Sequence, residues 1–231
     1  MWAPGPTSAG MSGSSGEVVS VHRPKPQVGP DTTKPVTVVP ANEASWDDLR
    51  AIFGSRGYAA YCQCQRPKMR SWAEWRSLQV SGRMQRLEEQ TQCGFASART
   101  TSGLVAYLDD EAVGWCAVEP RTAYARLLRT RIPWKGRDED RDDAGVWAVV
   151  CFVTRAGYRR RGVSRALARA AVDFARERGA RALEGYPMLV EPGQDVTWGE
   201  LNVGSRSVFA DAGFDEVSHP TLRRVVMRID F

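Results

Sequence analysis

The apolar and polar residues of the chain follow a pattern that predicts strands and helices in turn. Residues 146–154, VWAVVCFVT, are apolar at every position but the last, which is typical of a strand covered on both faces. Residues 162–180 carry apolar side chains at helical spacing and end near a glycine, so they predict a helix. The strand predicted at 181–187, RALEGYP, should run parallel to the first strand, because a helix connects the two.

Further elements are predicted on the N-terminal side of this unit. Residues 35–41 predict a short strand and residues 42–53 a helix. Residues 71–90 predict a helix broken near Gly82. Residues 103–120 predict a β-hairpin, because two apolar runs flank an acidic turn.

The two ends of the chain differ in character. Residues 205–214 predict a short helix and residues 221–231 a final strand. Residues 1–35 are rich in Gly, Pro and Ser and cannot bury enough apolar surface to offset their ordering entropy. We therefore expect a disordered tail at 1–35 and a single domain at 36–231.

Composition narrows the function classes. The chain has 231 residues, a formal net charge of +5, and acidic runs between its basic ones, so it lacks the clustered basic face of a nucleic-acid-binding protein. It shows neither an apolar run of about 18 residues nor a signal sequence, so no membrane partner is expected. Five cysteines, an odd number, predict reduced thiols and a cytoplasmic location.

Candidate chemistry lies in the turn between the buried strand and the helix. Three arginines, Arg159 to Arg161, precede Gly162 and Ser164. The free N–H groups of a first helical turn attract phosphate, small residues let a ligand approach, and arginines add charge-assisted contacts. The turn lacks both Gly-Lys-Ser/Thr and Gly-x-Gly-x-x-Gly. It therefore predicts a pyrophosphate bound without metal.

In these residues the sequence resembles the GNAT superfamily of N-acetyltransferases, whose signature after a central strand is Arg/Gln-x-x-Gly-x-Gly/Ala. Residues 159–164, Arg-Arg-Arg-Gly-Val-Ser, match it with serine in the last place. The family also tends to carry Asn, then Ala at three, Tyr at seven, and then Gly-Phe. The residues at that spacing are Asn202, Ser205, Phe209, Gly213 and Phe214.

The resemblance covers residues 36–231 and implies an α/β GNAT fold. In that fold a central mixed, mostly antiparallel sheet is splayed at the coenzyme site and flanked by helices. Acetyl-CoA is implied as the donor, with no metal. A primary amine, on a small molecule or a protein, would attack the thioester directly in a ternary complex. Dimers are common in the family, so a homodimer is one of the assemblies that the resemblance allows.

The same resemblance implies the coenzyme-binding residues. The pantetheine arm would bond to the backbone of the central strand, and the diphosphate would lie on the amides of the basic turn. The residues implied are Cys151, Phe152, Val153, Arg159, Arg160, Arg161, Gly162, Val163, Ser164, Arg165, Asn202 and Phe209.

The catalytic groups are less clear than the coenzyme site. Some family members place a general base Glu eleven residues before the signature arginine and a general acid Tyr seven residues after the Asn. Here these positions hold Ala148 and Phe209, which cannot transfer protons. We consider Glu119, Glu184 and Tyr186 as substitutes. A strand-end surface acid and a packed tyrosine are the simpler interpretations of Glu119 and Tyr186.

Two further features have both a functional and a structural interpretation. Cys62 and Cys64 could complete a zinc site with two more ligands, or could pack near the acceptor site. The acidic run from Asp138 to Asp143 could attract a cationic amine, or form a solvated loop.

Three functions therefore stay open. The first is an acetyl-CoA-dependent N-acetyltransferase acting on a primary amine. The second is a non-catalytic module of the same fold that binds acyl-CoA as a sensor or partner domain, which the missing Glu and Tyr favour. The third is a thiol or metal protein built on Cys62 and Cys64. The intact coenzyme turn favours the enzyme.

Overall fold

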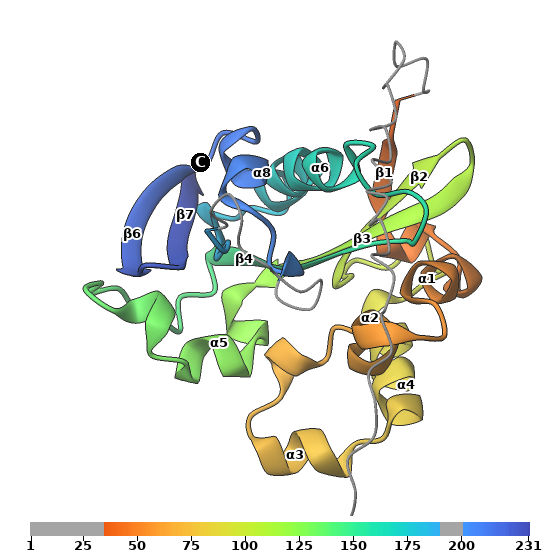
Figure 1. Ribbon diagram of the computed structural model, residues 1–231, viewed down its shortest axis with the longest axis horizontal. Helices are drawn as coiled ribbons and strands as arrows, with labels where there is room; N and C mark the ends of the chain where they lie inside the picture. The colour runs from red at the N-terminus through yellow and green to blue at the C-terminus, as the bar shows by residue number, and fades with distance from the viewer. Residues whose placement is uncertain (1–34, 190–200) are drawn as a thin grey trace, which may run out of the picture. The chain divides into compact units, whose positions relative to one another are not determined.

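The structure is a computed structural model in which residues 35–189 and 201–231 are described. Strands of this part form one sheet, in the order β1-β2-β3-β4-β5-β7-β6 (Figure 1). β4 and β5 run parallel, and every other neighbouring pair is antiparallel. The predicted mixed, mostly antiparallel sheet with its parallel pair is therefore confirmed. The strands are β1 (Thr37–Pro40), β2 (Gly103–Leu108), β3 (Glu111–Pro120), β4 (Val146–Thr154), β5 (Ala182–Gly185), β6 (Asp215–Thr221) and β7 (Arg224–Asp230).

Helices cover both faces of the sheet (Figure 1). The α-helices are α1 (Trp46–Phe53), α2 (Gly57–Cys62), α3 (Trp72–Ser77), α4 (Val80–Thr91), α5 (Ala125–Arg129), α6 (Val163–Glu177) and α8 (Arg206–Ala210). The 3₁₀ helices are η1 (Ala41–Glu43), η2 (Arg66–Lys68), η3 (Arg121–Ala123) and η4 (Ile132–Trp134). None of the helices in the described residues is both long enough and apolar enough to cross a bilayer.

Two buried clusters hold the layers together. On the face covered by α6, Leu167 shares a cluster with Phe152 and Phe209. On the opposite face, α1 packs against β3, and the rings of Phe53 and Trp115 lie 6.0 Å apart. The central strands are thus covered on both sides, as the continuous apolar run at 146–154 predicted.

Local sequence explains several element boundaries. α1 begins at a capping box, in which Ser45 Oγ accepts from the Asp48 N–H at 3.1 Å and the Asp48 carboxylate accepts from the Ser45 N–H at 3.0 Å. The predicted hairpin at 103–120 is confirmed as β2 and β3. Its turn residues Asp109 and Asp110 have φ of 52° and 64°, a conformation that suits the twist of a two-residue hairpin loop.

The segment 71–90 breaks elsewhere than predicted. α3 ends at Ser77 and α4 starts at Val80, so the break precedes Gly82. Gly82 lies inside α4, where a Cβ would come within 2.6 Å of the Leu78 side chain. The glycine therefore reflects close packing against Leu78 rather than a helix end.

The predicted final strand at 221–231 proves to be half of a hairpin. β7 is confirmed there, but β6 precedes it and forms the sheet edge. β6 was not predicted because its residues, DEVSHPT, are mostly polar and mostly exposed. α2 was not predicted either. The disordered tail predicted at 1–35 lies outside the described residues, apart from Pro35.

Gly114 sets how closely α6 approaches β3. A Cβ at this position would come within 2.4 Å of Val163 Cγ1 and 3.1 Å of Leu167 Cδ1. We expect Gly114→Ala to lower the free energy of unfolding by about 1–3 kcal/mol, measured by urea denaturation. In a Val163→Ala background the loss should shrink, because the nearest atom is gone. An equal loss in both backgrounds would contradict this account.

Candidate active site

A cleft of about 850 Å³ opens beside the C-terminal half of β4. One wall comes from the end of α1 and the loop into α2, and the other from the basic turn, the start of α6 and the segment around α8. Pairing between β4 and β5 ends at Val149 and Gly185, whereas β4 continues to Thr154. The end of this pairing leaves the remaining edge of β4 without a neighbouring β5 residue, and β4 residues line the cleft there.

Phe152 presents its backbone to this cleft. Phe152 lies opposite Cys116 in the β3–β4 register, and in an antiparallel pair alternate residues direct their backbone groups away from the partner strand. The Phe152 N–H donates to the Asn202 carbonyl at 2.5 Å. A coenzyme amide that bonds to Phe152 must therefore donate to the Phe152 carbonyl, or displace Asn202 from the Phe152 N–H.

Val150 is an extra residue in β4. The β3–β4 register shifts between Ala117 and Val118, and Val150 has no partner in β3. Such bulges leave a residue outside the ladder and are common beside active sites. Sequence patterns do not reveal this bulge, because the whole of β4 is apolar.

The basic turn has a backbone suited to an anion. Gly157, Arg160 and Gly162 all have positive φ, of 90°, 63° and 77°. Gly162 caps α6 without a side-chain hydrogen bond, and the first helical bond runs from the Ala166 N–H to the Gly162 carbonyl at 3.0 Å. The amides of residues 163–165 therefore have no acceptor within the helix, and with the helix dipole they form a site for a phosphate group.

The predicted coenzyme residues are only partly brought together. Those that line the cleft are Cys151, Phe152, Val153, Arg159, Arg160, Ser164 and Asn202. Arg161 lies over the Tyr158 ring at 5.4 Å, and Arg165 pairs with Asp211 at 2.5 Å. Gly162 contributes through its backbone, while Val163 and Phe209 are buried in the core.

The opposite wall of the cleft was missed by sequence reasoning. It consists of the loop 54–57, Gly-Ser-Arg-Gly, and Tyr58 at the start of α2. Gly54 and Gly57 have φ of 66° and 85°. The sequence signal that could have indicated this wall is a pair of glycines three residues apart, directly after a capped helix. Burial, followed by the neighbouring Cys62, raises the pKa of Tyr58, so the phenol stays protonated at neutral pH.

Three thiols, Cys62, Cys64 and Cys151, also line the cleft. Trp115 Nε1 donates to Cys64 Sγ at 3.1 Å. Burial, followed by Cys64, raises the pKa of Cys62 to about 11. A hydrogen bond with Cys64, followed by burial, raises the pKa of Cys151. The raised pKa values of Cys62 and Cys151 keep these two thiols protonated at neutral pH, which makes them weak nucleophiles. Within the described residues, no group of three or more His, Cys, Asp or Glu is arranged to hold a metal ion.

The three catalytic candidates lie around Ala148, at the position where the family resemblance expects a base. Glu119 of β3 and Glu184 of β5 are the direct neighbours of Ala148 in the sheet. Residues paired across adjacent strands share a face, so both carboxylates lie on the same side as the Ala148 methyl group. The sheet register thus supplies two acids beside a position that has none.

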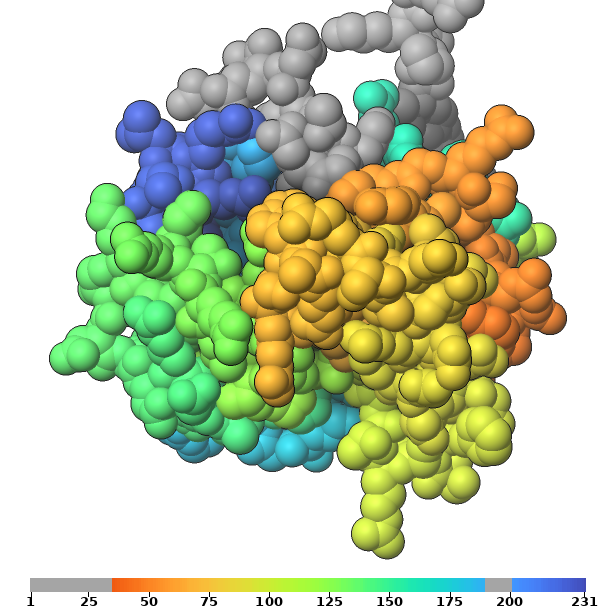
Figure 2. Space-filling model, turned by 90° about the horizontal axis from the view of Figure 1, so that it is seen from below, coloured from red at the N-terminus to blue at the C-terminus, as the bar shows by residue number. Residues whose placement is uncertain are grey.

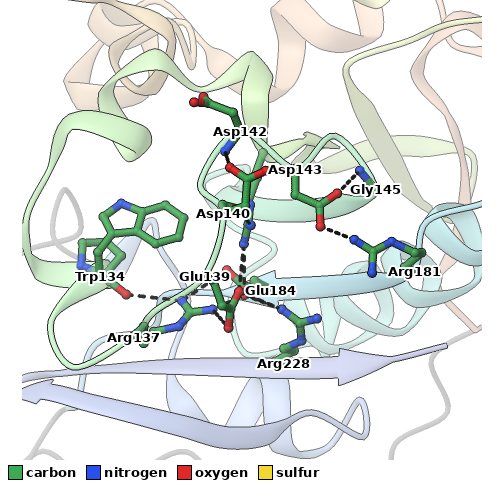
Figure 3. Close-up of polar contacts among 12 residues, drawn as sticks. Trp134, Arg137, Glu139, Asp140, Asp142, Asp143, Gly145, Arg181, Glu184 and Arg228 are labelled. Carbon is green, nitrogen blue, oxygen red and sulfur yellow. Dashed lines mark hydrogen bonds and ion pairs between the residues drawn. The ribbon is translucent and has the colours of Figure 1, made fainter.

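Glu184 is fully occupied by cations (Figure 3). Its carboxylate is buried and accepts from Arg228 at 3.0 Å, from Arg121 at 3.5 Å and from Arg137. The Tyr186 hydroxyl donates to the same carboxylate at 2.6 Å. Burial, followed by Glu184, raises the pKa of Tyr186. The arginines and Tyr186 hold the Glu184 carboxylate, and Glu184 holds the Tyr186 hydroxyl. These contacts favour a structural role for Glu184 and Tyr186.

The acidic run from Asp138 to Asp143 is a largely exposed loop, and two of its acids, Glu139 and Asp143, pair with arginines (Figure 3). Glu139 lies 3.3 Å from Arg121 and 3.2 Å from Arg228. The Asp143 carboxylate accepts from the Gly145 N–H at 2.8 Å and pairs with Arg181. Arginines of other elements thus neutralise these acids, and an acceptor amine is not the partner that the geometry favours.

Glu119 is held differently from Glu184. Its carboxylate pairs with one cation, Lys68 of η2, at 2.5 Å, and both side chains are about 15% exposed. The Tyr124 hydroxyl faces it without forming a hydrogen bond of normal geometry. Burial raises the pKa of Glu119, and Lys68 opposes the rise. A partly accessible carboxylate of raised pKa is suited to accept a proton near neutral pH.

Comparison with known proteins now identifies the family. The model of the acetyltransferase (GNAT) family matches residues 57–186, more than half of the chain. The chain belongs to the GNAT family. This GNAT protein is therefore an acyltransferase, and both the predicted fold and the predicted family are confirmed.

Solved structures of GNAT acetyltransferases resemble the chain at low identity. Ribosomal-protein-alanine N-acetyltransferase from Brucella melitensis is 17% identical, with 84% of this chain and 99% of that one covered and a TM-score of 0.46. A GCN5-related N-acetyltransferase from Kribbella flavida is 17% identical, with 85% and 98% covered and a TM-score of 0.45. YncA from Salmonella typhimurium, solved with its cofactor acetyl-CoA, is 14% identical, with 84% and 93% covered and a TM-score of 0.45. No curated protein matches the chain in sequence.

Proposed function

We propose that this GNAT acetyltransferase transfers an acetyl group from acetyl-CoA to a primary amine by direct attack in a ternary complex. The observation that carries the proposal is the start of α6, which has no side-chain cap, at a cleft beside the part of β4 that is not paired with β5. The diphosphate would bind the amides of residues 163–165, with Arg159 and Arg160 beside it. The pantetheine arm would follow β4 past Phe152.

In this proposal Glu119 is the general base. The amine loses a proton toward Glu119, directly or through water, and its nitrogen forms a bond to the thioester carbonyl carbon. The carbon–sulfur bond then breaks, and CoA leaves as a thiol. Among the described residues that line the cleft, Tyr58 is the one tyrosine, and we propose it as the partner of the leaving sulfur. Its hydroxyl stays protonated at neutral pH and would donate a hydrogen bond to the leaving sulfur, while the proton that completes the CoA thiol comes from solvent. The raised pKa values of Cys62 and Cys151 support direct attack rather than an acyl-cysteine.

Further observations bear on the alternatives. All five cysteines are free thiols, which supports the proposed cytoplasmic location. The single ion pair of Glu119 and its raised pKa favour an enzyme over a non-catalytic module that binds acyl-CoA. Release of CoA thiol from acetyl-CoA in the presence of amines separates these two functions, because a sensor module would bind the coenzyme without consuming it.

Coenzyme binding is tested at Gly162. A Cβ at Gly162 would meet no atom within 4 Å, so Gly162→Val changes the backbone preference rather than the space. A left-handed conformation costs a branched residue about 1–2 kcal/mol, and we expect the Kd for CoA to rise about tenfold, measured by calorimetry.

The matched control for this test is Gly179→Val. Gly179 has nearly the same φ, 76°, an equally open surrounding, and a place at the other end of α6. The Gly179→Val variant should have the same backbone strain but an unchanged Kd for CoA. Equal CoA binding by wild type and Gly162→Val would argue against the proposed cradle.

A further inference from the structure

Resting on the proposed function, we propose that the acceptor is a small amine that also carries an oxyanion, a carboxylate or a phosphate. Arg66 of η2 and Arg126 of α5 hold the oxyanion beside Trp72, while the amine lies near Glu119. The inference depends on the juxtaposition of two guanidinium groups, neither of which has an ion pair among the described residues, with a carboxylate suited to bind an amine.

The two guanidinium groups meet at one indole ring. The Arg66 guanidinium lies 3.6 Å from the centre of the Trp72 ring, and that of Arg126 lies 5.6 Å from it. Trp72 is 56% exposed, so a ligand can reach this group from solvent. Both guanidinium groups lie against the same ring, and each can form charge-assisted hydrogen bonds with a carboxylate or phosphate.

The charge of Arg66 has no carboxylate to balance it among the described residues. Burial, followed by the neighbouring Arg126, lowers the pKa of Arg66. The other groups that act on its charge are the Tyr58 phenol and the Cys62 thiol. The pKa of each is raised, so neither carries a negative charge at neutral pH. Arg66 Nη1 is buried and makes no hydrogen bond. Leaving a buried charged donor unpaired is costly, so an anion at this place is favoured.

Glu119 itself lies on β3, and the residues that face it, Lys68 and Tyr124, lie on or beside the two elements that carry the arginines. η2 supplies both Arg66 and Lys68, and the chain entering α5 supplies both Tyr124 and Arg126. Lys68 Nζ lies 2.5 Å from the Glu119 carboxylate, which shows that Glu119 accepts an alkylammonium group. One molecule with an amine and an oxyanion can therefore satisfy Glu119 and the two arginines together.

The arginine end of this site is the accessible part, because Arg126 and Trp72 are exposed, whereas Lys68 and Glu119 are about 15% exposed. Figure 2 looks onto it, with α3 near the centre and the green surface of α5 and η4 beside it. Tyr58 and Tyr61 of α2 are 44% and 47% exposed. Tyr58 also lines the coenzyme cleft, so the aromatic surface connects the proposed oxyanion site with the thioester.

The test uses matched pairs of amines in a CoA-thiol release assay. Each pair contains an amino acid and its decarboxylated amine, such as phenylalanine with phenethylamine and lysine with cadaverine. We expect the amino acid of at least one pair to be used with a kcat/KM at least about tenfold higher. Arg126→Gln should remove this preference by raising the KM for the amino acid while kcat stays the same. Arg126→Lys should keep most of the preference, and Arg76→Gln, an exposed arginine of α3, should change nothing.

Binding is measured in parallel, so that the inference does not depend on turnover. Calorimetry on the full chain saturated with CoA should show the amino acid binding more tightly than its decarboxylated amine, and Arg126→Gln should abolish the difference. Equal binding and equal use of the two members of every pair would overturn the inference but leave the proposed function standing. If the protein binds CoA normally but releases no CoA thiol with any of the amines, the proposed function is contradicted instead.

Discussion

Replacing Glu119 with glutamine is expected to lower kcat by about 10²–10⁴-fold while the Kd for CoA stays unchanged. Glutamine keeps the size of the side chain but cannot accept a proton from the amine. Glu119 does not line the coenzyme cleft, so coenzyme affinity should not follow the loss of activity. Steady-state CoA-thiol release and calorimetry with CoA measure the two quantities. Glu177→Gln, an exposed acid at the end of α6, serves as the control with normal kcat.

The pH profile gives this prediction a second readout. Burial raises the pKa of Glu119 above that of an ordinary glutamate, with Lys68 opposing the rise. A base works only when ionised, so wild-type kcat should fall as the pH drops through this raised pKa and level off above it. Glu119→Gln should lack that limb. A variant with wild-type kcat, or with the limb intact, would exclude Glu119 as the base.

The second large effect concerns stability. Glu184→Gln is expected to lower the free energy of unfolding by about 3–5 kcal/mol, because it leaves the buried guanidinium groups of Arg121 and Arg137 with only the partly exposed Glu139 as counter-charge. The side chains of Arg121 and Arg137 are 1% and 5% exposed, so water cannot replace the carboxylate. Urea denaturation followed by circular dichroism measures the change.

A surface ion pair provides the comparison for Glu184. Asp173 pairs with Arg176 on α6 at 3.5 Å, and both side chains are more than half exposed. Asp173→Asn should change the free energy of unfolding by less than about 1 kcal/mol. Equal effects of Glu184→Gln and Asp173→Asn would show that the arginine cluster does not depend on its central carboxylate.

Local periodicity was enough to predict the centre of the fold. The apolar run of β4, the amphipathic α6 and the helical connection between β4 and β5 are all local features, and each was predicted from its own residues. β6 and α2 escaped because their short sequences bury few side chains. The break between α3 and α4 was misplaced because Gly82 was interpreted as a helix breaker, whereas it makes room for Leu78.

The candidate site was harder to predict, because it depends on register and on distant contacts. That Glu119 and Glu184 flank Ala148 follows from the pairing of three strands, which no local pattern shows. Glu184 binds arginines that lie 44 to 63 residues away along the chain. The basic turn could be proposed as an anion cradle because its arginines and glycine are consecutive, whereas the facing loop at 54–57 was missed because only glycines mark it.

The contact between Gly185 and Phe209 links two distant positions. A Cβ at residue 185 would come within 2.1 Å of the Phe209 ring, so the aromatic ring fills the volume that any larger residue would need. Substitution at either place alone creates a clash or a hole. Homologues that carry a side chain at the first position should therefore carry a smaller residue at the second, and the two sites should vary together through evolution.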